Sequence, residues 1–376
     1  MNMADWKNMV DIAAAFRFPG DIFAVKDHFG DGHINSTYLL TMKEEDATLR
    51  KYIVQRFNRH AFPRPDLVMD NSTRVTRFLH DKILHDGGDP YRETLHFCTA
   101  AEGKPYAVDT EGEYWRAYHF IDDALSLQLI NEPGDFYTVA KTFALFNRRL
   151  VDFPAETLHE TIENFHNTPV RFGRFVKAVQ EDKLGRAAGC RREIEFILER
   201  EKDCHYLLLR QQRGELPVRV THNDTKLNNV LLDAETGDGV CVIDLDTVMP
   251  GLMAYDFGDS IRFGASTALE DEPDLSKVQL SLELFSAYTE GYMEVLADLL
   301  SPAEEQSLIW GAKLMTLEVG MRFLTDYLEG DVYFRIDETR PEHNLERSRT
   351  QLKLVQEMET HWAELERIMN RCRLHA

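Results

Sequence analysis

The sequence predicts an α+β protein of two lobes, a small N-terminal lobe built on an antiparallel sheet and a larger, mostly helical C-terminal lobe. The chain has 376 residues, more than one ordinary domain. Strand-like alternation of apolar and polar residues is concentrated before residue 121, and helical spacing of apolar residues dominates after residue 124. We therefore place the N-terminal lobe at 1–121 and the C-terminal lobe at 122–376.

Composition limits the classes of partner. With 43 Lys and Arg against 64 Asp and Glu, the formal net charge is −21, which argues against nucleic acid and anionic membranes as partners. The N-terminus has no signal peptide and no apolar stretch reaches membrane-spanning length, so we expect a cytoplasmic protein. Five scattered cysteines without a C-x-x-C pair indicate neither a disulfide framework nor a zinc site. We expect a monomer or a weak homodimer.

The elements of the N-terminal lobe follow from residue periodicity. Apolar residues at helical spacing predict a helix over 3–16 and another over 66–85. Alternating residues predict the antiparallel sheet. Its expected segments are a hairpin over 20–41, a strand over 48–57, and strands over 95–99, 105–108 and 114–121.

The C-terminal lobe begins after a short connection, residues 118–123, that we interpret as a hinge. The helical pattern then predicts a series of helices. They are expected over 131–150, 171–183, 190–212, 276–300, 302–329 and 341–370. The Arg- and Glu-rich segment 190–212 is typical of a solvated helix face and implies no partner.

The stretch 218–248 carries the chemistry. A β-branched run, Val218 to Val220, leads to His222 and Asp224, and Asn229 follows five residues after Asp224. A second apolar run ends in Asp244, with Asp246 two residues later. Phosphoryl transfer from a nucleotide needs such a set, because a carboxylate orients the acceptor hydroxyl while amide and carboxylate oxygens hold Mg²⁺.

Each residue of this stretch has a predicted role. Asp224 is the candidate base, and Asn229 and Asp244 are candidate Mg²⁺ ligands, with Asp246 a further one. Lys226 suits an ammonium that reaches the transferring phosphate. Asp and Asn are also common in turns, where they form local hydrogen bonds, so any one of these residues alone has a plain structural explanation. The complete set between two apolar strands favours catalysis.

Three motifs identify a family resemblance. They are His222-Asn-Asp224-Thr-Lys226-Leu-Asn-Asn229, Val-Ile-Asp244-Leu-Asp246 and Tyr255-Asp256-Phe257-Gly258-Asp259. Together they resemble the aminoglycoside phosphotransferase superfamily, the small-molecule branch of the protein-kinase-like fold. Stretches at 32–38, 52–58, 114–118 and 322–331 extend the likeness over nearly the whole chain. Within the superfamily, 322–331 is most similar to kinases that phosphorylate the anomeric hydroxyl of N-acetylhexosamines.

The resemblance implies an enzyme that uses ATP and Mg²⁺ to convert a small sugar to its 1-phosphate. It implies that His33, Arg322, Asp326 and Tyr327 lie near the sugar, with Asp259 or Arg262 lining the cleft and Asp256 structural. Arg322 and Asp326 are also spaced as an ordinary surface ion pair. Another small-molecule kinase (for a different sugar, choline, homoserine or an aminoglycoside) and a non-catalytic nucleotide-binding relative remain alternatives. A protein kinase is disfavoured, because no A-P-E-like segment follows Asp244.

The resemblance also implies a nucleotide site in the N-terminal lobe. Gly30 and Gly32, with Asn35 and Thr37, belong to a loop that can lie over phosphates, although a plain hairpin turn explains the loop as well. Arg56 is the candidate phosphate-binding cation, with Lys51 competing. Asp70 is its candidate carboxylate partner, unless it is a surface residue. The hinge around His119 and Ile121 is expected to contact the adenine.

Overall fold

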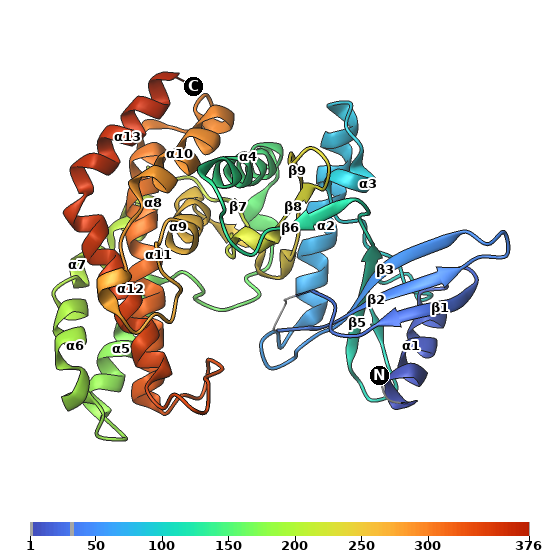
Figure 1. Cartoon of the computed structure of the whole chain (residues 1–376), viewed down its shortest axis with the longest axis horizontal. Coiled ribbons are helices and arrows are strands. Elements are labelled where there is room, and N and C mark those ends of the chain that lie inside the picture. The colour runs from blue at the N-terminus through green and yellow to red at the C-terminus, as the bar shows by residue number, and fades with distance from the viewer. Residues whose placement is uncertain (1–2, 31–33, 376) are drawn as a thin grey trace. The chain divides into compact units, whose positions relative to one another are not determined.

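The computed structural model describes residues 3–30 and 34–375, so Gly32 and His33 lie outside the described residues. The chain divides into two compact units (Figure 1). The first unit comprises Met1–Leu125, Thr157–Ile162 and Leu231–Met249. The second comprises Ser126–Glu156, Glu163–Val230 and Pro250–Ala376.

A five-stranded antiparallel sheet forms the centre of the first unit, and its order is β1-β2-β3-β5-β4. The strands are β1 (Asp21–Lys26), β2 (Ser36–Lys43), β3 (Leu49–Arg56), β4 (Ala107–Val108) and β5 (Tyr114–His119). Alternate residues of β2, including Leu40 and Met42, share one hydrophobic core with Met9 and Ile12 of α1 (Met3–Ala15). The predicted antiparallel sheet is therefore confirmed.

One expected strand of this sheet is wrong. Residues 95–99 run beside β5 but form only an isolated bridge, Phe97 to Tyr118. Two further backbone bonds, from Cys98 N to Ala117 O and from His119 N to His96 O, fix the segment without completing a ladder. The apolar residues that suggested a strand are needed for packing instead, since Phe97 packs against the small core around Phe57.

Helix α2 (Pro65–His85) positions the segment that follows Asp244. It starts with Pro65, whose fixed φ suits a first helical residue. The Asn71 amide donates to the carbonyls of His159 and Val248 at 2.8 and 2.9 Å, and the Ser72 hydroxyl donates to the Leu245 carbonyl at 3.2 Å. These buried bonds fix the backbone of residues 245–248 to the helix.

A small three-stranded sheet, in the order β6-β8-β9, leads to Asp244. Its strands are β6 (Ala124–Ser126), β8 (Val230–Asp233) and β9 (Gly239–Val242). Arg92 of the one-turn helix α3 (Pro90–Glu93) ties this sheet to the predicted hinge. Its guanidinium donates to the carbonyls of Asp122 and Asp123 at 2.8 and 3.2 Å, and it pairs with Asp233 at 2.5 Å.

The second unit is mainly helical. Its longer helices are α4 (Pro133–Arg149), α5 (Thr168–Glu181), α9 (Met253–Gly264), α10 (Leu282–Leu296), α11 (Pro302–Glu329), α12 (His343–Thr360) and α13 (Trp362–His375). Among the described residues, no helix is both long enough and apolar enough to cross a membrane. The antiparallel-sheet and helical parts give the kinase-like α+β fold that the sequence predicts.

Two predicted helices are interrupted. The segment 190–212 forms α6 (Arg191–Leu198), α7 (Glu201–Cys204) and α8 (Tyr206–Gln212), and 341–370 is divided between α12 and α13. The break at Arg200 has φ −103° and ψ 15°, outside helical values. Its guanidinium is bound by Glu359 at 2.6 Å and by the Phe196 carbonyl at 2.7 Å. The interruptions let apolar residues of all three short helices reach the same core.

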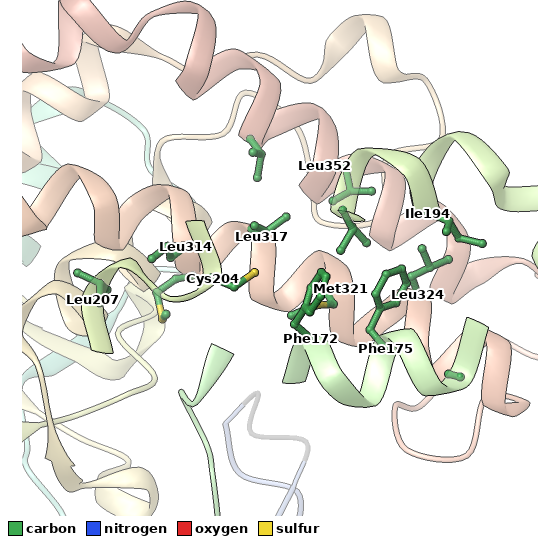
Figure 2. Close-up of a cluster of buried hydrophobic side chains, with 14 of the residues drawn as sticks. Phe172, Phe175, Ile194, Cys204, Leu207, Leu314, Leu317, Met321, Leu324 and Leu352 are labelled. Carbon is green, nitrogen blue, oxygen red and sulfur yellow. The ribbon is translucent and has the colours of Figure 1, made fainter. Parts of the chain in front are cut away.

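Helix α11 is the central element of the second unit. Figure 2 shows Phe172 and Phe175 of α5 beside Met321 and Leu324 of α11, with Leu352 of α12 completing the cluster. Helix α9 approaches α11 backbone to backbone: a Cβ on Gly258 would lie 2.3 Å from the Gly311 carbonyl oxygen. A side chain at this contact would therefore move α9.

Candidate active site

The loop after β7 (Arg219–Thr221) gathers the predicted catalytic residues of the second unit. The Lys226 ammonium lies 2.9 Å from Asp224 Oδ1. The Asn229 amide nitrogen donates to the Asp224 carbonyl at 2.8 Å and to its Oδ2 at 3.2 Å. Because the Asn229 nitrogen faces Asp224, its amide oxygen remains for another partner. The structure thus brings Asp224, Lys226 and Asn229 together.

Asp256 holds this loop in shape. Its carboxylate, 1% exposed, accepts hydrogen bonds from the backbone N–H groups of His222 and Asn223 at 2.9 and 2.8 Å. The Asn147 amide donates to the same carboxylate at 3.1 Å. Asn223 takes the left-handed conformation, φ 64°, which asparagine tolerates. These contacts fit the structural role that the family resemblance implies for Asp256.

Asp259, also on α9, supports the next residue of the loop. Its carboxylate accepts from the Thr225 N–H at 3.0 Å and from Arg262 Nε at 2.9 Å. Arg262 also forms an ion pair with Glu270 at 2.8 Å, and Glu270 forms a second ion pair with Arg347 at 2.5 Å. Asp259 and Arg262 are both nearly fully buried. In this structure the Asp259 carboxylate therefore binds the Thr225 N–H of the loop and the Arg262 guanidinium.

The charges around Asp224 keep it ionised. Burial favours the neutral acid, but Lys226 and the more distant His222 and Arg262 outweigh it and lower the pKa of the Asp224 carboxyl. Asp224 in turn raises the pKa of the Lys226 ammonium above its usual value. Both groups are therefore charged throughout the neutral pH range.

Lys226→Met is expected to lower kcat about 100-fold, by analogy with the loss of one transition-state donor. It should also move the acidic limb of the kcat profile to higher pH, because the pKa of Asp224 rises when the nearby cation is removed. The pH dependence of kcat, measured from mildly acidic to mildly basic buffer, checks this. Lys202→Met, at an exposed lysine of α7, is the matched control. An unmoved limb would show that Lys226 does not set the ionisation of Asp224.

In the first unit, Asp244 follows β9 and takes the left-handed conformation, φ 58°. Asp246, two residues on, is buried and both of its oxygens have partners within this unit. One oxygen is bound by the Arg116 guanidinium and the other accepts from the Asn35 amide at 2.7 Å. Both oxygens of Asp246 are thus bound by protein groups, and the metal-ligand roles of Asp244 and Asp246 stay predictions.

The predicted ion pair between Arg56 and Asp70 is not formed. Asp70 lies 3.1 Å from His159 Nε2 and 3.5 Å from Arg74, while the Arg56 guanidinium lies 5.9 Å from the centre of the Trp115 ring. The competing cation, Lys51, pairs with Asp122 of the predicted hinge at 2.5 Å. Which of the two cations binds phosphate stays a prediction.

The other residues assigned to nucleotide binding lie in the same unit. Gly30 has φ 78°. The Thr37 hydroxyl accepts from Gln55 at 3.0 Å. Ile121 is buried, and burial lowers the pKa of the half-buried His119.

Two structural residues of the site are missing from the sequence-based prediction. Arg116 of β5 is 2% exposed and binds Asp246 and, at 2.8 Å, Gln55. Asn147 of α4 binds Asp256. A signal for each exists in the sequence. Arg116 is a charged residue within an aromatic strand, and Asn147 follows Phe143 by four residues on an otherwise apolar helix face.

Arg116→Met is expected to lower the free energy of unfolding by about 3–5 kcal/mol, because Asp246 is then left buried without its cation. Urea denaturation measures the loss. Arg77→Met, at an exposed arginine of α2, is the control. The double variant Arg116→Met/Asp246→Leu should lose less than Arg116→Met, and an equal loss would mean that lost packing, not the unpaired carboxylate, causes the effect.

A pocket at the C-terminal end of α11 contains two of the residues predicted to contact the acceptor. It is lined by Arg171, Arg174, Arg322, Thr325, Asp326, Tyr333 and Phe334. Asp326 fixes the chain segment that forms one side of the pocket. Its carboxylate accepts hydrogen bonds from the backbone N–H groups of Val332, Tyr333 and Phe334 at 2.8 to 3.0 Å. Tyr327 does not line the pocket. It is buried, and the Arg186 guanidinium lies over its ring, 4.5 Å from the ring centre.

Comparison with known proteins identifies the family. Residues 28–292 match the model of the phosphotransferase enzyme family. The chain belongs to this family. The match spans both the catalytic loop and the segment around Asp244, and it confirms the family that the motifs predict.

Solved structures confirm the fold. An aminoglycoside phosphotransferase from Alicyclobacillus acidocaldarius is 14% identical, with 92% of this chain and 94% of that chain covered and a TM-score of 0.57. Amicoumacin kinase, in complex with AMP-PNP and Ca²⁺, is 12% identical, with 93% of each chain covered and a TM-score of 0.59. Choline kinase from Cryptosporidium parvum is 14% identical, with 96% of this chain and 97% of that chain covered and a TM-score of 0.52.

The two predicted metal ligands, Asn229 and Asp244, offer oxygen donors. Within residues 3–30 and 34–375, no group of three or more His, Cys, Asp and Glu side chains could hold a metal ion. Mg²⁺ is usually bound through one or two carboxylates together with phosphates of the substrate and water. The Asp244 carboxylate and the Asn229 amide oxygen are donors of this kind.

Proposed function

We propose that this member of the phosphotransferase family transfers the γ-phosphoryl group of ATP to a hydroxyl of a small carbohydrate. The specific candidate reaction is phosphorylation of the anomeric hydroxyl of an N-acetylhexosamine. The observation that carries the proposal is the Asp224 carboxylate, kept ionised and fixed by Lys226, Asn229 and the Asp256-bound loop. The amicoumacin kinase complex with AMP-PNP supports a nucleotide as the donor.

In this reaction Asp224 orients the acceptor hydroxyl and accepts its proton as the oxygen attacks phosphorus. Lys226 neutralises charge that develops on the transferring group. Asn229 keeps Asp224 in place through its amide nitrogen. When bound, Mg²⁺ would supply positive charge to the phosphates, and its predicted ligands are Asn229 of the second unit and Asp244 of the first. The rest of the catalytic effect comes from holding the acceptor and the nucleotide in position, and no covalent enzyme intermediate forms.

The pocket around Arg322 supports a carbohydrate over a cationic acceptor. Three of its lining residues are arginines, and a choline-like ammonium would be repelled by them. Guanidinium N–H groups instead donate to hydroxyl and amide carbonyl oxygens, both present in an N-acetylhexosamine. Choline and ethanolamine, the acceptors named for two solved structures with this fold, are therefore less suited to this pocket.

A panel of acceptors tests the proposal. Purified protein with Mg·ATP is incubated with N-acetylglucosamine, N-acetylgalactosamine, glucose, galactose, choline, homoserine and kanamycin. ADP release measures turnover, and phosphorus NMR identifies the product. A sugar 1-phosphate from the N-acetyl sugars supports the specific reaction. Turnover of choline, homoserine or kanamycin alone would reject the carbohydrate assignment and leave the roles of Asp224 and Lys226 standing.

Arg322→Ala is expected to raise the KM of the sugar about 100-fold, the size of a lost hydrogen bond to a charged group, and to leave the KM of ATP nearly unchanged. The reason is that Arg322 lines the acceptor pocket in the second unit, whereas the residues assigned to nucleotide binding belong to the first. Steady-state kinetics with each substrate varied in turn measure both values. Arg335→Ala, at an exposed arginine nearby in the chain, is the control. Equal effects on both KM values would remove Arg322 from the acceptor site.

A further inference from the structure

The pocket at the C-terminal end of α11, called here the arginine pocket, gathers three arginines, and two of them have no ion-pair partner among the described residues. Arg171, Arg174 and Arg322 line it together, in a protein whose net charge is −21. Arg174 is paired with Glu329, at 2.5 Å. Among the described residues, no carboxylate lies within 4.0 Å of the guanidinium nitrogens of Arg171 or Arg322.

The acidic groups nearby are already engaged. Asp326 accepts from three backbone N–H groups and from the Asn344 amide at 3.0 Å. Glu318, one turn before Arg322 on α11, is fully buried and is bound by His166 at 3.0 Å and by the Thr168 hydroxyl at 2.7 Å. Together with Glu329 they balance the three arginines in formal charge, but their oxygens do not occupy the donors of Arg171 and Arg322.

Both arginines are held in place and retain N–H donors. The Arg322 guanidinium lies over the rings of Phe165, Tyr333 and Phe334 at 5.3 to 5.7 Å, and such contacts hold the group without using its N–H donors. Arg171 Nη2 donates to the Phe165 carbonyl at 3.3 Å, whereas its buried Nε has no hydrogen-bond acceptor in the described part of the chain. Burial and the neighbouring Arg322 lower the pKa of Arg171.

We infer that this pocket binds an oxyanion, a carboxylate, sulfate or phosphate group, between Arg171 and Arg322. Planar guanidinium groups match the geometry of such oxyanions and bind them bidentately. The inference rests on the proposed function and narrows it: the preferred acceptor is an acidic sugar, such as an N-acetylhexosamine that carries a sulfate or carboxylate.

Matched pairs of ligands test the inference by calorimetry, which does not depend on turnover. The pairs are glucose with glucuronate and N-acetylglucosamine with N-acetylglucosamine 6-sulfate, and inorganic phosphate is titrated separately. The acidic member of at least one pair is expected to bind about tenfold or more tightly than the neutral member, as a charge-assisted bidentate contact allows. Arg171→Gln should abolish this difference in affinity between the acidic and the neutral member. Arg335→Gln, which removes an exposed charge, should preserve it.

The outcomes separate the possible sources of the oxyanion. Inorganic phosphate binding that disappears in Arg171→Gln, with equal affinities within both sugar pairs, keeps the oxyanion site but assigns it to a free anion. Equal affinities within both pairs and no phosphate binding would overturn the inference. Retention of the acidic preference in Arg171→Gln would also overturn it. If acidic sugars bind through Arg171 but no acceptor is phosphorylated, the proposed function fails and the oxyanion site remains.

Discussion

Asp224→Asn is expected to lower kcat by about 1,000-fold while nucleotide affinity and thermal stability change little, because an amide cannot accept the proton of the acceptor hydroxyl. Loss of a positioned general base typically costs about two to four orders of magnitude in rate. The fold should tolerate the change, because the Asn229 amide still donates to the carbonyl of residue 224. Single-turnover phosphate transfer, with nucleotide binding measured by calorimetry, gives both quantities.

Asp238→Asn is the control for this experiment. It makes the same chemical change at an exposed aspartate in the turn between β8 and β9. Near-normal activity of Asp224→Asn would reject Asp224 as the base. A large fall in melting temperature in Asp224→Asn alone would instead show that the pairing of Asp224 with Lys226 is needed for folding, and the kinetic result would then require Asp224→Glu as a second variant.

Asp256→Ala is expected to lower the free energy of unfolding by about 3–5 kcal/mol and to reduce kcat strongly in the fraction that remains folded. The substitution leaves the buried N–H groups of His222 and Asn223 and the Asn147 amide without their common acceptor, and each buried unsatisfied donor costs about 1–3 kcal/mol. Without these bonds the loop no longer fixes Asp224. Urea denaturation and kcat at a temperature well below the transition measure the two effects.

Asn147→Ala gives a graded comparison, because it removes only one of the three donors to Asp256. We expect a smaller loss of stability, about 1–2 kcal/mol, and a smaller loss of kcat. If Asp256→Ala and Asn147→Ala were equally destabilising, the backbone bonds to the loop would not be the main contribution of Asp256. If Asp256→Ala kept full kcat, the loop would not depend on this carboxylate for its catalytic shape.

Features that arise locally were predictable from the sequence. Helix and strand periodicity indicated the antiparallel sheet and the long helices, because each depends on residues a few positions apart. The grouping of Asp224, Lys226 and Asn229 was predictable for the same reason, since all three belong to one loop. The interruption at Arg200 was not, because it depends on Glu359, which lies 159 residues further along the chain.

Contacts between distant residues account for most of the remaining differences. The contact of Asp246 with Arg116, which precedes it by 130 residues, was not predictable, and the role of Asp246 as a possible further metal ligand stays a prediction. The family resemblance made Asp70 the candidate partner of Arg56, but His159 and Arg74 contact Asp70 in the structure. Only part of the arginine pocket was predictable, because Arg171 and Arg174 come from a helix whose sequence alone indicates nothing beyond an amphipathic helix.

The close contact of α9 with α11 at Gly258 and Gly311 has a consequence for how enzymes of this kind can diversify. Gly311 lies in the half of α11 that sets the position of Asp256 and Asp259, whereas Arg322 is eleven residues later, about 16 Å along the same helix axis. On the proposed acceptor site, selection for new acceptors can therefore act on the last turns of α11 and on Tyr333 and Phe334 without disturbing the loop that carries Asp224. A library of variants restricted to these positions should retain nucleotide binding in most of its members. Substitutions at Gly258 or Gly311 should be eliminated by selection for activity, whichever acceptor is used.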